Sequence, residues 1–311
     1  MTRGFITIAT GKEMYYKLAL NLLKSYRLYS RNPLPFAIMC DRENDYTKQF
    51  DQVVILEQPL YSFWDKFELL VKAPFDETIF IDADCLAYAD LNEYWDYFAE
   101  ADDFTGCGTN YPIESESGLF QAEEIGEYCG RAHWKPDICG GLYFIRRGES
   151  CNALYKECQH ISQIYDSFRW PDFCAPRADE TVLCLAMAVH GLHAMEADPK
   201  NYGHPWEATQ MEFDIFTGKC TYATHWHPKV EQGRLVHFGT RNCTKPPYIF
   251  EVEKLNVMLK YGLKPGGDTF PLGFWDSLLY RCKLRYYYLC TKDVMVRGFR
   301  KILRMMKIAP K

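Results

Sequence analysis

Short apolar runs alternate with helical patterns in the N-terminal part of the chain, and this alternation restricts the fold more than any other feature. Apolar residues recur at helical spacing over residues 15–29, and a second helix is predicted over residues 66–73. Runs rich in β-branched and aromatic residues predict strands at residues 5–10, 35–40, 51–56 and 77–81. Strands that alternate with helices predict an α/β fold, with a mixed, mostly parallel sheet flanked by helices.

The second half of the chain has fewer regular patterns. Residues 140–145 predict a buried strand, residues 179–189 a helix, and residues 234–239 a short strand that ends in a glycine. Between residues 195 and 235 the chain is polar, with several Trp, His and Pro residues, which is typical of loops. We therefore expect one α/β domain over residues 1–250, followed by a helical, basic and aromatic extension over residues 251–311.

Two carboxylates follow the fourth predicted strand directly. Asp82 and Asp84 lie just beyond its carboxyl end, and ligands bind at that edge in open α/β sheets. Together the two side chains can bind a hard divalent cation through oxygen. Such a cation can stabilise the charge on a diphosphate as it leaves a sugar. An alternative interpretation is that the pair only caps the next segment, residues 85–88.

Composition limits the class of protein. The net charge of -5 argues against general nucleic-acid binding through phosphates. The 13 cysteines are odd in number and include no C-x-x-C pair, so neither a disulfide framework nor a zinc knuckle is indicated. The N-terminus shows no signal-peptide pattern, and no apolar stretch approaches the roughly 20 residues that span a bilayer. We therefore expect a cytoplasmic protein with reduced thiols.

The predicted segments, taken in order, resemble those of nucleotide-sugar glycosyltransferases with the Rossmann-like GT-A fold. The chain is most similar to glycosyltransferase family 8, the type of glycogenin and the bacterial lipooligosaccharide galactosyltransferases, over roughly residues 3–250. The segments that carry the resemblance are Phe5 to Thr10, Lys66 with Pro74 and Ile79-Phe80-Ile81-Asp82-Ala83-Asp84, Gly140-Gly141-Leu142-Tyr143-Phe144-Ile145, Ala178-Asp179-Glu180-Thr181-Val182-Leu183, and His237-Phe238-Gly239 with Lys245-Pro246.

The resemblance implies a site for a UDP-sugar and a divalent cation, Mn²⁺ or Mg²⁺. It assigns the cation to Asp82, Asp84 and His237, although a core histidine before a turn is the alternative for His237. The candidate catalytic residues are Asp179, as a contact to a sugar hydroxyl, and Glu180, as a general base. The resemblance assigns donor contacts, beyond those three cation ligands, to Thr7, Ala9, Thr10, Lys66, Ala83, Gly239, Arg241 and Lys245.

Three departures from the family pattern affect these assignments. An insertion, residues 241–244, separates His237 from Lys245, so Arg241 could share or replace the contact of Lys245 with the diphosphate. Cys139 stands where the family has asparagine, and Glu180 where it has glutamine. The family retains anomeric configuration, yet a carboxylate at a helix N-terminus could also serve as the base of an inverting transfer. A helix cap is the alternative role for Glu180.

The C-terminal segment is basic and aromatic. From Arg281 to Lys311 there are ten Lys or Arg residues and one acid, Asp293, and the cations alternate with Tyr, Leu and Met residues. A basic amphipathic helix favours contact with an anionic membrane surface, here through residues 274–307, and bacterial members of the family carry a similar tail. Packing of this helix on the domain is the alternative. The protein could therefore be peripheral on the inner membrane face.

These patterns predict a metal-dependent glycosyltransferase. It would move a hexose from a UDP-sugar to a glycan or lipid-linked acceptor, with retention of anomeric configuration. One alternative is a catalytically degenerate protein of this fold that binds a glycan or a membrane. Another is a sugar-phosphate nucleotidyltransferase, which needs a glycine-rich basic loop after the first strand, where only Thr10-Gly11-Lys12 is available.

Overall fold

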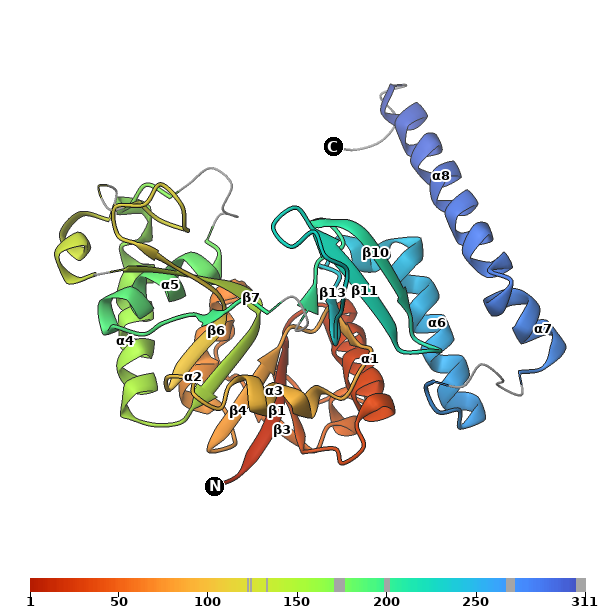
Figure 1. Cartoon of the computed structure of the whole chain (residues 1–311), viewed down its shortest axis with the longest axis horizontal. Helices are drawn as coiled ribbons and strands as arrows, with labels where there is room; N and C mark the ends of the chain where they lie inside the picture. Colours follow the sequence, from red (N-terminus) through yellow and green to blue (C-terminus); the bar gives the residue numbers. More distant parts are fainter. Residues whose placement is uncertain are drawn as a thin grey trace.

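A seven-stranded mixed sheet forms the centre of the protein, which we describe from a computed structural model (Figure 1). The structure describes residues 1–121, 123, 125–132, 134–170, 177–198, 202–266 and 272–305. The strand order is β3-β2-β1-β4-β7-β6-β8. The first four are parallel, and β7 is antiparallel to both β4 and β6, which confirms the predicted mixed α/β sheet. The strands are β1 (Arg3–Ala9), β2 (Phe36–Cys40), β3 (Gln52–Ile55), β4 (Glu77–Ile81), β6 (Phe104–Pro112), β7 (Trp134–Arg146) and β8 (Met195–Glu196).

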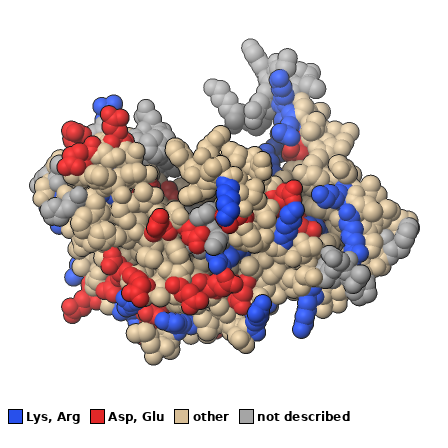
Figure 2. All heavy atoms as spheres, in the orientation of Figure 1, with Lys and Arg blue, Asp and Glu red and all other residues tan. Residues whose placement is uncertain are grey.

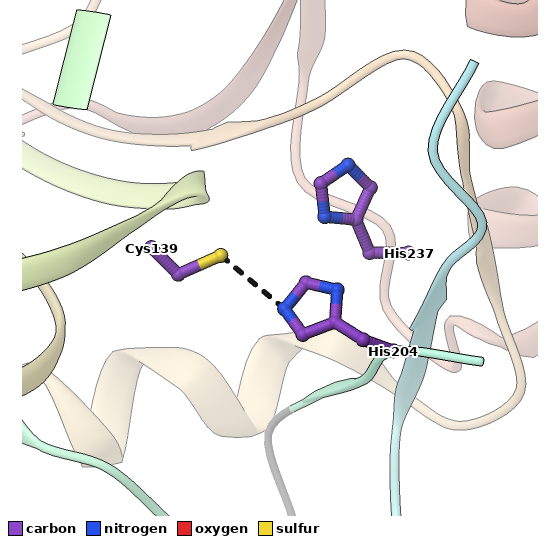
Figure 3. Close-up of side chains that lie close together, drawn as sticks. All are labelled: Cys139, His204 and His237. Atoms are coloured by element: carbon purple, nitrogen blue, oxygen red, sulfur yellow. Dashed lines mark hydrogen bonds between the residues drawn. The ribbon is translucent and has the colours of Figure 1, made fainter. Parts of the chain in front are cut away.

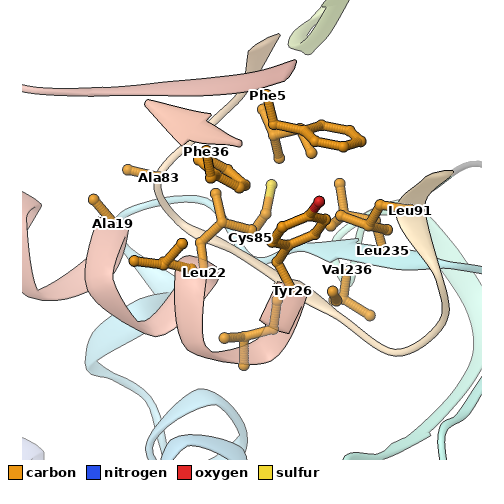
Figure 4. Close-up of a cluster of buried hydrophobic side chains, with 14 of the residues drawn as sticks. Phe5, Ala19, Leu22, Tyr26, Phe36, Ala83, Cys85, Leu91, Leu235 and Val236 are labelled. Carbon is orange, nitrogen blue, oxygen red and sulfur yellow. The ribbon is translucent and has the colours of Figure 1, made fainter. Parts of the chain in front are cut away.

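Helices cover both faces of this sheet because successive side chains of a strand point to opposite faces. Phe5 of β1 packs with helix α1 (Glu13–Tyr29), in the cluster drawn in Figure 4. The next residue, Ile6, packs on the other face with helices α4 (Glu149–Gln163) and α5 (Asp179–His190). The shorter helical segments are η1 (Thr47–Gln49), η2 (Phe63–Glu68), α2 (Leu69–Lys72), η3 (Leu91–Glu93), α3 (Tyr94–Tyr97), η5 (Gly126–Arg131), η6 (Tyr165–Ser167) and η7 (Asn242–Thr244).

Two three-stranded sheets are added to the central one. The first has the order β5 (Cys85–Ala87), β13 (Leu235–His237), β9 (Tyr202–Gly203). The second has the order β10 (Ala208–Asp214), β11 (Lys219–Thr224), β12 (Glu231–Gln232). The prediction of loops between residues 195 and 235 is therefore wrong for much of that segment. Its Thr, Tyr and Phe residues form a hairpin that turns at Gly218, where φ is +78°.

The C-terminal part of the chain is helical. The predicted division at residue 250 falls inside helix α6 (Pro246–Tyr261), whose Leu255 and Met258 are buried in the cluster that contains α1. Beyond it lie α7 (Phe274–Asp276), the π-helix η8 (Ser277–Arg281) and α8 (Leu284–Met305). Helix α8 contacts α6 at its beginning and then stands away from the rest of the chain (Figure 1).

The charge asymmetry of the sequence is visible on the surface. On the face shown in Figure 2, acidic side chains gather at the lower left, and Lys and Arg are more frequent on the right, where α6 and α8 lie. Among the residues that the structure describes, no helix combines the length and apolar composition needed to cross a bilayer. The described cysteines are all free thiols, and most are buried.

Candidate functional site

Strand pairing brings His237 to the two aspartates at the end of β4. The backbone N–H of Asp82 donates to Gly141 O of β7 at 3.0 Å, which fixes the turn after β4. Strand β13 pairs antiparallel with β5, with His237 opposite Cys85. The imidazole Nε2 consequently lies 3.0 Å from Asp84 Oδ1 and 3.8 Å from Asp82 Oδ2.

Asp84 and His237 have the donor atoms and spacing of a divalent-cation site. Asp84 Oδ2 accepts a hydrogen bond from the Thr240 hydroxyl at 2.9 Å. Its Oδ1 is buried and, within the described part of the chain, accepts no hydrogen bond of good geometry, although it lies close to His237. Adjacent ligands about 2.1 Å from an octahedral ion lie about 3 Å apart, which matches the separation of Oδ1 and Nε2. These two groups, with Asp82 beside them, therefore fit Mn²⁺ or Mg²⁺, and the nitrogen donor suits Mn²⁺ better.

Lys66 lies beside the predicted cation-binding residue Asp82 and is surrounded by protein. Its ammonium contacts Asp82 Oδ2 at 3.0 Å, Gly140 O at 2.9 Å and Asp179 Oδ2 at 3.2 Å. Its side chain is only 8% exposed. Burial opposes its charge, but the carboxylates of Asp179 and Asp82 raise the pKa of Lys66 above its ordinary value. Lys66 thus links the carboxylate of β4 to the start of α5 and has no free face toward a ligand.

The first two residues of α5 differ in their surroundings. Asp179 is buried and is held by Lys66 and by the Tyr143 hydroxyl, which donates to Oδ2 at 2.8 Å. Glu180 is partly exposed, and its Oε1 accepts a hydrogen bond from the Gly140 backbone N–H at 2.6 Å. Burial, and next the charge of Asp179, raise the pKa of Glu180 to about 7. A carboxyl group with this pKa can exchange a proton near neutral pH.

The predicted donor residues of the first strand occupy unequal positions. Thr7 is fully buried within β1, and Ala9 is nearly so. Thr10 follows the strand at the surface, and its hydroxyl donates to Asp65 Oδ2 at 3.1 Å. The next residue, Gly11, has a φ of +75° and donates its N–H to Asp41 Oδ1 at 3.1 Å. A ligand at this end of the sheet would reach Thr10 rather than Thr7.

The segment after β13 carries two cationic side chains. Gly239 has a φ of +68°, which favours glycine, and the Trp206 ring packs against its Cα. The inserted residues form the 3₁₀ turn η7, so the chain returns toward α6 after Arg241. Arg241 is exposed and Lys245 half-buried, and neither side chain forms an ion pair within the described part of the chain. Both are available to an anionic ligand.

Solved structures share this arrangement of elements. No protein-family model matches the chain, and no curated protein matches its sequence. The chain is similar to the galactosyltransferase LgtC in complex with donor and acceptor sugar analogs, with a TM-score of 0.52 and 12% identity, over 86% of this chain and 97% of that one. The chain has the GT-A fold. An active-site mutant of LgtC, glutamine to glutamate, matches over the same shares with a TM-score of 0.50 and 14% identity.

A thiol and a second imidazole lie beside the predicted site of this GT-A domain. Cys139 Sγ is 3.4 Å from His204 Nε2, and the His204 ring centroid is 5.0 Å from that of His237 (Figure 3). Burial lowers the pKa of His204 to about 3, so this imidazole is neutral. The sequence did not indicate His204, because the polar segment around it lacks a metal-binding spacing.

Other Trp and His residues of the polar segment between residues 195 and 235 follow strand β11. The segment His225-Trp226-His227 follows β11, and the Trp226 side chain is 87% exposed there. Thr240, like His204, was not predicted, since a single threonine after a strand carries no pattern. Its hydrogen bond to Asp84 is evident only once β5 and β13 are paired.

Proposed function

We propose that the protein is a metal-dependent glycosyltransferase that moves a hexose from a UDP-sugar to a glycan or lipid-linked acceptor, with retention of configuration. The observation that carries this proposal is the convergence of Asp82, Asp84 and His237 at the carboxyl edge of β4 in a GT-A fold. Ligands bind at that edge in open α/β sheets, and a leaving diphosphate requires a counter-charge there.

The residues around the aspartates would keep this edge ready for the donor. A divalent cation, when bound, supplies Lewis-acid stabilisation of the charge on the leaving UDP. Thr240 orients Asp84, and Lys66 orients Asp82, through hydrogen bonds of 2.9 and 3.0 Å. Such outer partners fix ligand geometry. Arg241 and Lys245 are the cations available to diphosphate oxygens.

We assign to Glu180 the transfer of a proton to or from the reacting hydroxyl, at the part of the site that would hold the donor sugar. Glu180 is partly exposed, and its raised pKa of about 7 suits transfer of a proton to or from a reacting hydroxyl. An active-site glutamine has been changed to glutamate in one of the LgtC structures, so this fold accommodates a glutamate in an active site. Asp179, held by Lys66 and Tyr143, would act as a positioning residue. Retention rests on the family resemblance, and Glu180 as the base of an inverting transfer is the alternative.

Calorimetry tests the donor proposal. We expect UDP to bind in the presence of Mn²⁺ and to lose affinity in Asp82→Asn and Asp84→Asn variants. Asp96→Asn serves as a matched control, because Asp96 is an exposed aspartate of α3. A panel of UDP-sugars tested for slow Mn²⁺-dependent hydrolysis then identifies the donor. Unchanged UDP affinity in both site variants would contradict the proposal.

A binding protein without activity is the second candidate. Cys139 stands where family 8 has asparagine, and its Sγ contacts His204 Nε2. This contact favours an altered binding site for the donor sugar. In that case UDP would bind, yet no UDP-sugar would be hydrolysed or transferred. A nucleotidyltransferase is less well supported, because the Gly11 N–H, which would have to bind phosphate, donates to Asp41.

We also propose that the tail from α7 to α8 binds an anionic membrane surface. Its exposed apolar side chains include Trp275, Tyr287, Met295 and Phe299, and exposed cations such as Lys292 and Arg300 lie between them. Aromatic and basic residues together favour the interface of an anionic bilayer. Residues 306 and 307 of the predicted membrane segment lie outside the described residues. The full chain should sediment with vesicles rich in phosphatidylserine and not with phosphatidylcholine vesicles.

A further inference from the structure

Two further potential metal ligands, Cys139 and His204, lie on the side of His237 that faces away from the aspartates. The ligand atoms of Cys139, His204 and His237 all lie within 4.8 Å of one another. They come from β7 of the central sheet, from the segment after β9 and from β13, so the close approach of the small β5-β13-β9 sheet to β7 brings them together. Figure 3 shows the thiol and both imidazoles turned toward one another.

The His237 ring presents one nitrogen to each side. Its Nε2 lies toward Asp82 and Asp84, as given by the 3.8 and 3.0 Å separations. Its Nδ1 is buried and has no hydrogen-bond partner among the residues that the structure describes. A buried, unpaired nitrogen is costly unless something binds it. The ring nitrogen turned toward Cys139 and His204 is thus free to coordinate an ion.

We propose that Cys139, His204 and Nδ1 of His237 form a nitrogen–sulfur site for a borderline-soft divalent cation such as Zn²⁺. Thiolate and imidazole are the donors that such ions prefer, and the carboxylate side of His237 offers oxygen instead. At typical Zn–S and Zn–N distances, tetrahedral ligands lie about 3.6 Å apart. The Cys139–His204 separation of 3.4 Å is close to that value. Water would complete the tetrahedron.

This site and the carboxylate site exclude each other. A neutral imidazole offers only one nitrogen lone pair, because its other nitrogen carries the proton. Zn²⁺ at Nδ1 leaves the proton on Nε2, where it can be donated to Asp84, as in carboxylate–histidine–zinc arrangements. His237 is then lost to a cation held by Asp82 and Asp84. Zinc binding also releases the Cys139 thiol proton to solvent.

Zinc binding can be measured without any donor, so its failure would be distinct from failure of the proposed transferase function. The full-length, metal-stripped chain is titrated with Zn²⁺ against a chromophoric chelator, and in parallel with Co²⁺. We expect one Zn²⁺ per chain and a thiolate-to-cobalt absorption band. The Cys139→Ser variant should lose the band, and both Cys139→Ser and His204→Gln should weaken Zn²⁺ binding at least about tenfold.

Matched controls separate this site from other thiols, histidines and carboxylates. Cys282→Ser removes an exposed thiol, and His225→Gln removes an imidazole after β11, so both should bind Zn²⁺ like the wild type. Asp82→Asn should retain Zn²⁺, and excess Mn²⁺ should weaken Zn²⁺ binding, because both ions need His237. Unchanged Zn²⁺ affinity in a folded Cys139→Ser variant would overturn the proposal, as would a larger loss in Asp82→Asn than in Cys139→Ser.

Discussion

At the scale of single residues, Lys66 is the group on which the carboxylates of the site depend. It is 8% exposed and contacts both Asp82 and Asp179. We expect Lys66→Met to lower the free energy of unfolding by about 3–5 kcal/mol, because removal of one partner leaves buried charges uncompensated. Urea denaturation measures this loss.

Lys72→Met is the matched control. The Lys72 side chain is 38% exposed and pairs with Glu68 one helical turn away, so its removal should cost no more than about 0.5 kcal/mol. An equal loss in the two variants would contradict the role given to Lys66.

Glu180 makes the stability of the protein depend on pH. Burial and Asp179 raise its pKa from 4.5 to about 7 in the folded state. The folded chain therefore binds the extra proton between these values, and the contribution of Glu180 to stability falls as the pH rises toward 7. Glu180→Gln keeps an acceptor for Gly140 and never ionises. It should thus be more stable than the wild type at pH 8 and no more stable near pH 4.5.

Urea denaturation at pH 4.5, 6 and 8 measures this difference. The exposed Glu43→Gln serves as the control and should show no comparable trend. A Glu180→Gln advantage that is constant with pH would argue against a raised pKa at this position.

The sequence could place only those candidate site residues whose pattern is local. Asp82 and Asp84 follow an apolar strand, so their position at a sheet edge could be predicted from neighbours in the chain. The link between Lys66 and Asp179 could not, since it joins residues far apart in the chain and depends on how α5 packs on η2 and β7. For the same reason the sequence suggested a ligand-binding role for Lys66, although its ammonium contacts protein groups.

At the scale of elements, close contact between β7 and β13 shapes the site. A Cβ at Gly141 would lie 2.9 Å from His237 Nδ1, nearer than packed atoms allow. We expect Gly141→Ala to displace the imidazole and to weaken Mn²⁺-dependent UDP binding about tenfold or more. Calorimetry compares this variant with Gly130→Ala, where an added Cβ meets no atom of the described residues within 4 Å. Equal affinities would show that His237 tolerates the shift.

Elements were predictable where one periodicity extended over enough residues. Helix α1 and the four parallel strands match their predicted positions to within two residues. Strands β10 and β11 were missed because their pattern is diluted by Trp, His and Pro residues in the adjoining turns. Their stability comes from pairing with each other, which a local pattern does not encode.

At the scale of the whole molecule, the tail is separable from the α/β part. Among the described residues beyond 266, only Leu289 is buried, and Arg285 adds an ion pair to Glu253. A chain that ends at residue 266 should therefore lose at least about 1.5–3 kcal/mol of stability, the contribution of one buried leucine, because Leu272 and Tyr280 also pack against the core. Its UDP affinity should match that of the full chain, and its binding to anionic vesicles should vanish.

Calorimetry and vesicle sedimentation measure the two properties independently. Vesicle binding that survives in the shortened chain would assign the membrane contact to the α/β part. Because the attraction is electrostatic in part, binding of the full chain should also weaken as salt rises.

The pairing of β5 with β13 has a consequence for biosynthesis. His237 leaves the ribosome 153 residues after Asp84, which corresponds to roughly 8–30 s of translation at about 5–20 residues per second. Lys66, by contrast, precedes both aspartates and can neutralise Asp82 as soon as β4 has formed. During synthesis the positive charge of Lys66 is therefore present near Asp82 long before His237 has been added to the chain. The protein would be able to bind a cation at this site only late in synthesis.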